Sequence, residues 1–322
     1  MKHQLRTVRY LFSGIAIILT LILLGCNPAQ VVPVPSPSPV LATPPRASAD
    51  AVRVGILGIR SAVAVTGQYG ALTTYLSETV DRPFTLIPLN QEDQFTKVEQ
   101  SNLEFVFSNP LAAVQIQRLY DTQFLATISR PQTGTKFSGL IVVNAESDIE
   151  TLDDLRGKRG ACVAFQTAAG GCNFQIFHLR QHGLDPYTDF SSFTETGSQD
   201  NIVLAILNNT VDVGFIRTGQ LERMVDEGLV ADMDEIRILD RIEDDYFYPH
   251  TTRLYPEWPF AALTNTDPEL VEAVKTALLN IPPDHPALQT ARANGFITPE
   301  DYTPIDELIE DLKLRGWDAK PD

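Results

Sequence analysis

The chain has 322 residues, a hydrophobic content of 43% and a formal net charge of −16 at pH 7. This length and composition allow one large or two medium-sized globular domains. The acidic balance argues against nucleic-acid binding, because neutralising phosphates requires a basic patch and the sequence shows none. It also gives no long-range attraction for anions, so an anion site would depend on local N–H groups and one or two cations.

A basic leader and an uncharged apolar run open the chain. The run extends from Leu11 to Leu24 and, at about 14 residues, is short for a membrane span. It ends in LLGC, a small residue directly before Cys26, which resembles the lipobox of exported bacterial lipoproteins. The resemblance predicts removal of residues 1–25 as a signal peptide and acylation of Cys26, with an uncleaved N-terminal anchor as the alternative. Either way, we expect the rest of the chain outside the cytoplasm and tied to a membrane.

Residues 26–50 differ in composition from both of their neighbours. Proline and small residues dominate the segment, and charged residues are almost absent. Such a composition cannot build a core and predicts an extended, partly polyproline tether. Folding is expected from residue 51 onward, where no apolar run approaches the roughly 18 residues of a further membrane span.

Strands and helices alternate from residue 51. Apolar runs predict strands over residues 52–57, 84–89, 105–107, 124–129, 139–143, 160–165, 189–193 and 211–216. Helical periodicity predicts helices over residues 70–80, 111–120, 149–155, 173–182, 200–207, 268–279 and 304–314.

This order predicts an α/β fold with two units, at about 51–135 and 140–247, and largely parallel sheets. We interpret it as a two-lobed clamp whose chain crosses between the lobes twice, with ligand in the cleft. Within a solute-binding domain of residues 51–322, lobe 1 would comprise about 51–138 plus 252–322. Lobe 2 would comprise about 139–251. Each lobe would be a mixed, mostly parallel sheet flanked by helices.

Two cysteines remain once Cys26 is assigned to lipid. Cys162 and Cys172 form an even pair in an oxidising compartment, and a disulfide between them would contribute about 2–3 kcal/mol. Two separate buried thiols or a reactive pair are the alternatives. The spacing is not that of a metal site.

Several motifs between about residues 51 and 315 carry a family resemblance. They are VRVGIL, FVFSNPLAA, LDDLRGKR, VDVGFIRTGQLE and TTRLYPEWPFAAL. On these motifs the chain resembles the phosphate-, phosphite- and phosphonate-type (PhnD-like) periplasmic solute-binding proteins, which have the type II fold. The last two motifs and the ending ITPEDYTPIDELIEDL are most similar to the sensor regions of tetrathionate-sensing (TtrS-like) histidine kinases. The chain departs from these relatives at Gln199, where Gly-Ser-His-Asp is common, so specificity would differ if that histidine contacts ligand.

The resemblance implies an oxyanion held between the lobes. Ligands of α/β sheets bind beyond the carboxyl ends of strands, where helix N-termini present free N–H groups. Helix caps without a ligand, or a flexible turn over residues 166–171, are the alternatives. The sequence has three predicted turns that lead from a strand into a helix. From these turns we expect ligand contacts by Ser108, Asn109, Gln166, Thr167, Thr196 and Ser198.

Cations and hydroxyls complete the predicted ligand-binding set. Arg217 ends the predicted strand 211–216, where a guanidinium can bind an oxyanion through two hydrogen bonds; a pair with Glu222 or Asp212 is the alternative. Arg253 offers a second cation, or else a structural ion pair with Glu257. The remaining members are Tyr69, Thr218 and Thr252.

The five histidines form no catalytic motif. His178 and His182 stand four apart on a predicted helix and could share a metal ion. Because no third ligand lies near them in the sequence, we interpret the pair as a solvated helix face. The sequence therefore predicts a binding protein without enzymatic activity, cofactor or metal.

Two functions fit these features. The first is a lipid-anchored extracytoplasmic protein that captures a small oxyanion for an ABC permease in the membrane. The alternative is a receptor subunit, for a sulfur oxyanion, that feeds a separate sensor kinase, since the chain as given ends at Asp322 without a kinase domain. Both predict a monomer on the extracytoplasmic face of the cell membrane, with a small anionic ligand and no nucleic-acid partner.

Overall fold

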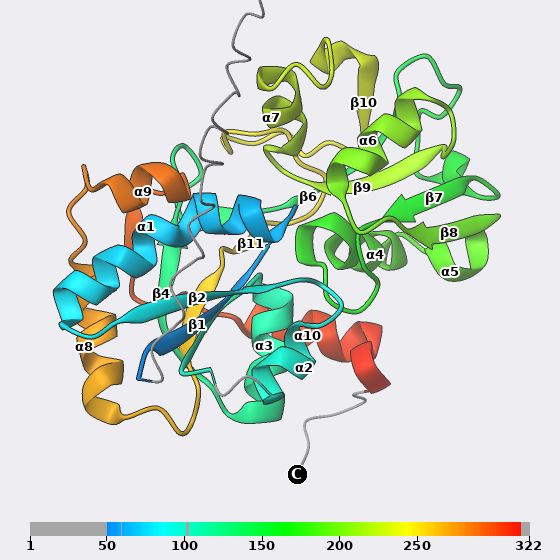
Figure 1. Ribbon diagram of the computed structural model, residues 1–322. Coiled ribbons are helices and arrows are strands. Elements are labelled where there is room, and N and C mark those ends of the chain that lie inside the picture. Colours follow the sequence, from blue (N-terminus) through cyan, green and yellow to red (C-terminus); the bar gives the residue numbers. More distant parts are fainter. Residues whose placement is uncertain (1–49, 59, 101–102, 317–322) are drawn as a thin grey trace, which may run out of the picture. The chain divides into compact units, whose positions relative to one another are not determined.

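The computed structural model describes residues 50–58, 60–100 and 103–316, which are organised around two β-sheets (Figure 1). The beginning and the end of this range build one sheet, and its middle builds the other. The predicted signal peptide, Cys26 and the tether up to residue 49 lie outside the described residues. Among the helices that the structure describes, none combines the length and the apolar character needed to cross a bilayer.

The lobe 1 sheet has six strands in the order β13-β4-β12-β3-β1-β2. The strands β1, β2, β3 and β4 run parallel, whereas β12 is antiparallel to both of its neighbours, β3 and β4. Since β12 follows lobe 2 in the sequence, lobe 1 is completed only after the chain has returned from lobe 2. The bounds are β1 (Val52–Leu57), β2 (Phe84–Leu89), β3 (Phe105–Phe107), β4 (Gln123–Ser129), β12 (Pro259–Ala262) and β13 (Gly295–Ile297).

Helices cover both faces of this sheet. Phe105 and Phe107 belong to the cluster under α1, α8 and α9, whereas Val106 between them belongs to the cluster under α2 and α3. The alternation follows from the period of two in a strand, and burial on both faces explains the continuous apolar run. The helices are α1 (Ala62–Val80), α2 (Gln94–Gln100), α3 (Pro110–Tyr120), α8 (Pro268–Leu279) and α9 (Pro286–Ala291).

The lobe 2 sheet has five strands in the order β10-β6-β9-β7-β8. β7, β8 and β9 are parallel, and β6 is antiparallel to β9 and β10. Its strands are β6 (Gly139–Asn144), β7 (Arg159–Cys162), β8 (Ser192–Glu195), β9 (Val213–Arg217) and β10 (Ile236–Leu239). Its helices are α4 (Phe174–Gln181), α5 (Pro186–Asp189), α6 (Gln199–Leu207) and α7 (Gln220–Asp226), with shorter turns η1 (Asp153–Leu155), η2 (Ala169–Asn173) and η3 (Met233–Glu235).

Two short strands form the crossing between the lobes. β5 (Lys136–Phe137) leads into lobe 2, and β11 (Tyr255–Pro256) leads back, and the two pair antiparallel. The helix α10 (Thr303–Leu312), followed by η4 (Leu314–Gly316), then packs its apolar side into the lobe 2 cluster. On its other side Arg118 of α3 lies 2.6 Å from Asp306. The predicted two-lobed α/β fold, with a mixed sheet flanked by helices in each lobe, is thus confirmed.

Several predicted element bounds were wrong. Instead of at residue 70, the first helix begins at Ala62, where Ser61 caps it. The prediction missed its first turns because Gly67 and Gly70 lie inside the helix and weaken the helical pattern of the sequence. The strand predicted over 160–165 stops at Cys162, where Val163 N–H turns to donate to the Gly171 carbonyl. In place of the extended segment predicted over 189–193, the structure has the strand β8 at Ser192–Glu195. In place of the helix predicted over 149–155, it has only the short turn η1 at Asp153–Leu155.

The disulfide between Cys162 and Cys172 is present, and both residues are fully buried. It joins the end of β7 to η2 across a sequence separation of 10. A bond that closes a loop of this size stabilises mainly by restricting the unfolded chain, by about 3 kcal/mol.

We therefore predict that the double variant Cys162→Ala/Cys172→Ala loses about 3 kcal/mol of unfolding free energy, measured by urea denaturation. Wild-type protein in reducing agent should fall to the same value. Equal stability of the oxidised wild type and the variant would show that the crosslink contributes nothing.

Candidate functional site

A cavity of about 780 Å³ lies between the two lobes. Lobe 1 lines it with the start of α1, the turn after β4, and the end of α9 with the residues that follow it. Lobe 2 lines it with residues 217–227, from the end of β9 through α7, and with Tyr246 and Tyr248. The lining therefore comes from strand ends, from the loops after them and from helix termini of both lobes, which is where α/β folds place their ligands.

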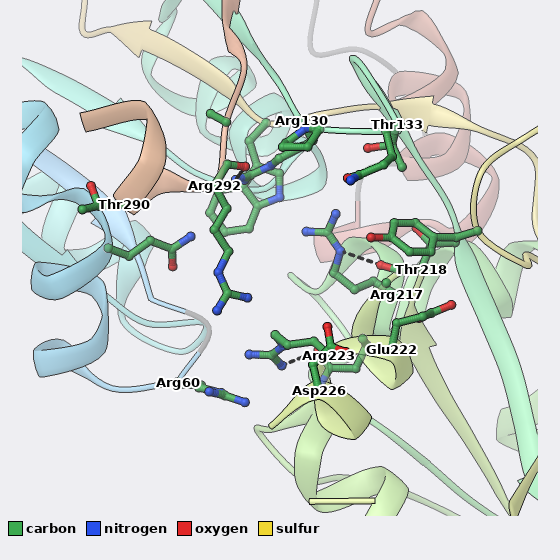
Figure 2. A pocket seen from close by; sticks show the side chains of 18 of the residues that line it. Arg60, Arg130, Thr133, Arg217, Thr218, Glu222, Arg223, Asp226, Thr290 and Arg292 are labelled. Atoms are coloured by element: carbon green, nitrogen blue, oxygen red, sulfur yellow. Dashed lines mark hydrogen bonds between the residues drawn. The ribbon is translucent and has the colours of Figure 1, made fainter. Parts of the chain in front are cut away.

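Arginine is the dominant charged residue of this cavity. Figure 2 shows guanidinium groups from both lobes directed into one space. Three carboxylates share the lining, and two more, Asp200 and Glu257, pair with its arginines from just outside it. The arginines are Arg60, Arg130, Arg217, Arg223 and Arg292, and the carboxylates are Glu222, Asp226 and Glu227.

A buried carboxylate fixes two of these arginines. Glu257 has a fully buried side chain and lies between the two crossing segments, 2.9 Å from Arg217 Nη2 and 3.8 Å from Arg130 Nε. Its backbone N–H donates to the Thr135 carbonyl, and its own carbonyl accepts from Tyr302. Burial alone would lower the pKa of Arg130, but the neighbouring Tyr69 and Glu257 raise it. One carboxylate thus holds a guanidinium from each lobe at the cavity wall.

A second network crosses the cleft. Arg60, from the turn before α1, lies 3.0 Å from Asp200 and 2.7 Å from Glu227 of lobe 2. Arg223 shares Asp200 at 3.1 Å. The pKa of Arg223 is lowered, chiefly by burial and also by the nearby charges of Arg60 and Arg292. The carboxylates of Asp200 and Glu227 act in the opposite direction but do not cancel this effect. The positive charges here therefore repel one another, and a bound anion would relieve that repulsion.

Arg292 differs from the other arginines of the lining in its ion pairing. Within the described ranges of the chain it makes no ion pair, whereas each of the other four does. It ends α9 in the left-handed conformation, with φ 51°, and its side chain extends into the space between Arg60 and Arg217 (Figure 2). Its guanidinium is available to a ligand without breaking a contact.

A smaller cavity of about 220 Å³ adjoins Arg60. Lobe 1 lines it with Gly58 and residues 90–92, and lobe 2 lines it with Val163, Gly197 and Gln199. Gln199 Oε1 accepts from the backbone N–H of Arg217 at 2.7 Å. Gln199 thus lies between this cavity and the strand end that carries Arg217.

Three of the predicted ligand residues line the larger cavity: Tyr69, Arg217 and Thr218. Tyr69 is packed edge-on against Phe107, and its hydroxyl accepts from Arg130 at 3.4 Å. Arg217 pairs with Glu257, neither with Glu222 nor with Asp212; the latter instead holds Arg159.

Four of the predicted residues meet where the lobes touch, outside the lining of both cavities. Asn109 caps α3 and also donates to the Thr167 carbonyl at 3.0 Å, and the Gln166 carbonyl accepts from Gln115 at 2.7 Å. Ser108 donates to Gln94 at 2.8 Å. Asn109 and the backbone carbonyls of residues 166 and 167 therefore join the lobes, whereas Ser108 bonds within lobe 1 and the buried Thr167 hydroxyl makes no hydrogen bond among the described residues. A role in ligand binding stays a prediction for all four.

The glycines of the 166–171 turn serve packing. A side chain at Gly170 would come within 2.8 Å of Phe137, and one at Gly171 within 2.8 Å of Val163. These contacts, together with the buried positions of both residues, explain glycine there without a ligand that approaches the backbone.

The last four predicted residues also lie outside both linings. Ser198 caps α6, and Thr196 donates to the Ser198 carbonyl. Thr252 is buried and bonds Ser138. Arg253 pairs with Glu307 and lies over the ring of Tyr255 at 5.0 Å, so the expected alternative of a pair with Glu257 was wrong.

Four arginines of the cavity escaped the sequence analysis. Arg130 directly follows β4, the same signal that singled out Arg217, and Arg60 lies in the first strand-to-helix turn. Arg223 stands on α7, a helix that the pattern did not reveal. No local sequence pattern marks Arg292 as a binding residue, because it reaches the cavity only through the return of the chain to lobe 1.

Comparison with known proteins identifies the family. The model of the family described as "ABC transporter, phosphonate, periplasmic substrate-binding protein" matches residues 54–303. The chain belongs to this family of periplasmic substrate-binding proteins.

Solved structures of phosphonate-binding proteins share the fold. PhnD1 from Prochlorococcus marinus, solved in complex with methylphosphonate, superimposes with a TM-score of 0.68 at 17% identity, over 82% of this chain and 98% of that one. A binding-protein component of a phosphonate ABC transporter from Pseudomonas aeruginosa gives 0.69 at 14% identity, over 82% and 87%.

A sensor kinase is similar in sequence. The tetrathionate sensor histidine kinase TtrS of Salmonella typhimurium is 27% identical over 265 residues, which are 81% of this chain. The chain spans 43% of the length of that relative.

The geometry of Glu257 predicts a large effect of substitution. Glu257→Gln leaves the buried charge of Arg130 and the charge of Arg217 without their carboxylate, which should lower the unfolding free energy by about 3–5 kcal/mol in urea denaturation. The matched control is Glu243→Gln, which removes the same charge from an exposed pair with Arg241. It should change stability by less than about 1 kcal/mol. Equal effects of the two substitutions would contradict a structural role of Glu257.

Proposed function

We propose that this protein is a lipid-anchored extracytoplasmic binding protein that captures a small oxyanion and delivers it to an ABC permease. The observation that carries the proposal is the set of guanidinium groups that both lobes direct into one cavity, with Arg292 left without a carboxylate. Guanidinium groups bind phosphate, phosphonate and sulfur oxyanions through paired, charge-assisted hydrogen bonds.

The electrostatics of the site support an anion of this class. A ligand that contacts Arg292 of lobe 1 and Arg217 of lobe 2 ties the lobes together. As the cleft closes and water leaves, these contacts strengthen. The net charge of the chain does not oppose this, because salt screens charges beyond about 8–10 Å. The volume of about 780 Å³ also accommodates an organic substituent on the anion.

The remaining predictions complete the proposal. Family membership as a periplasmic protein supports export, with residues 1–25 as signal peptide, Cys26 as the lipid attachment and 26–50 as tether. The ligand-binding domain would be residues 51–322, with the lobe bounds predicted from the sequence. The binding set would combine Tyr69, Arg217 and Thr218 with Arg60, Arg223 and Arg292, in a monomer that contacts its partner at the membrane.

One observation favours a second function. The similarity to TtrS extends over most of this chain but covers less than half of that kinase. A receptor subunit that binds a sulfur oxyanion and signals through a separate membrane kinase is therefore the alternative.

We predict that calorimetric titration of the purified protein with phosphate, phosphite, methylphosphonate, sulfate, thiosulfate and tetrathionate finds a ligand from this panel. Arg292→Ala and Arg217→Ala should each weaken its affinity at least about tenfold, the loss expected for charge-assisted hydrogen bonds. The controls Arg82→Ala in lobe 1 and Arg159→Ala in lobe 2 remove the same charge outside both cavities and should leave affinity unchanged. Weaker than millimolar binding of all six anions would overturn the oxyanion proposal.

A deletion strain separates the two functions. If the protein serves a permease, deletion should abolish uptake of the labelled ligand found in the titration. If it serves a kinase, uptake should persist, and ligand-dependent transcription should be lost instead.

A further inference from the structure

Three side chains with metal-binding chemistry meet on lobe 2, outside the cavities described above. His178 lies in α4, His182 caps the end of that helix, and Asp240 directly follows β10. One ligand atom of each lies within 4.8 Å of the others. Helical spacing explains the histidine pair, since residues four apart share a face. The fold supplies the third group from a strand end 58 positions beyond His182 in the sequence.

The hydrogen bonds determine where the protons are. His182 Nδ1 lies 2.8 Å from the carbonyl oxygen of His178, and because a carbonyl only accepts, Nδ1 carries a proton. In the neutral ring, Nε2 of His182 then presents a lone pair, at 4.0 Å from Asp240 Oδ2. His178 Nε2 lies 2.7 Å from the same carboxylate oxygen and donates to it. A lone pair and a carboxylate oxygen thus face each other across a gap that suits a cation.

We propose that His178, His182 and Asp240 bind a zinc ion. Two imidazole nitrogens and one carboxylate oxygen are a ligand set of Zn²⁺, and the fourth position of the tetrahedron would be taken by water. Solvent reaches the site, because the side chains of His182 and Asp240 are 48% and 43% exposed. Magnesium and calcium, which take oxygen ligands, do not fit it.

Only small movements are needed for coordination. Tetrahedral Zn²⁺ with bonds of about 2.0–2.1 Å separates its ligand atoms by about 3.4 Å. The two histidine nitrogens lie 2.7 and 4.0 Å from Asp240 Oδ2, and all three ligand atoms lie within 4.8 Å of one another, so shifts of about 1 Å bring them to this spacing. On coordination the neutral His178 ring keeps its one proton, which moves by exchange with solvent from Nε2 to Nδ1, so that Nε2 presents a lone pair to the ion and Asp240 loses this hydrogen bond. The carbonyl that accepts from His182 Nδ1 holds that ring in the coordinating tautomer, as outer partners of metal-bound histidines do.

The elements that carry the ligands are anchored. The helix α4 packs on the lobe 2 sheet through Phe174 and Leu179, both fully buried. At the other side, the carbonyl of Leu239 accepts from Thr251 at 2.8 Å, and β10 pairs with β6 up to Leu239. A bound ion would therefore tie α4 to the start of the segment that leads to Tyr246 and Tyr248 in the large cavity.

Calorimetric titration of ZnCl₂ into the purified, chelator-treated protein without a histidine tag tests the proposal. We expect one Zn²⁺ per chain, and no binding of Mg²⁺ under the same conditions. His182→Ala and Asp240→Asn should each weaken zinc affinity at least about tenfold. Both side chains are half exposed, so these variants should fold, which circular dichroism checks.

The matched control is Asp148→Asn, which removes a carboxylate from the same lobe where its side chain is 87% exposed. It should leave zinc affinity unchanged. Two results would overturn the proposal: no zinc binding by the wild type at millimolar concentration, or binding that His182→Ala and Asp240→Asn leave as strong as in the control.

Discussion

The ion pairs of Glu257 are the constraint on which the arrangement of the two lobes depends. A carboxylate that no water reaches requires compensating charge, and here it finds one guanidinium from each lobe. Glu257 lies in the segment by which the chain returns to lobe 1, between β11 and β12. The crossing, the sheet that β12 completes and the positions of Arg130 and Arg217 are therefore linked through one side chain.

Ion pairs also fix most of the arginine side chains around the cavity. Each arginine that has a carboxylate partner is held in place, and held groups bind a ligand without first losing conformational freedom. Arg292 is the exception, since it makes no direct ion pair with a described carboxylate. An acidic protein can in this way present guanidinium groups to an anion, because short-range contacts and not net charge determine the interactions inside the cleft.

Local sequence patterns predicted much of the fold but less of the site. Apolar runs placed the buried strands such as β1 and β3, and the pair Cys162 and Cys172 pointed to the disulfide. The rule that helix N-termini bind anions led to Asn109 and Thr167, yet in the tertiary structure the Asn109 amide joins the lobes by donating to the backbone carbonyl of Thr167. Arg217 was found because it ends a strand. Arg292 and Glu257 could not be assigned, since their positions depend on how the chain returns from lobe 2, which no local pattern encodes.

The most direct test is a crystal structure of the protein with the oxyanion that binds most tightly in titration. The account predicts that the oxygen atoms of the anion lie within hydrogen-bond distance of guanidinium groups from both lobes, Arg292 and Arg217 among them. An anion bound instead between Asn109 and Thr167, with no guanidinium contact, would contradict it.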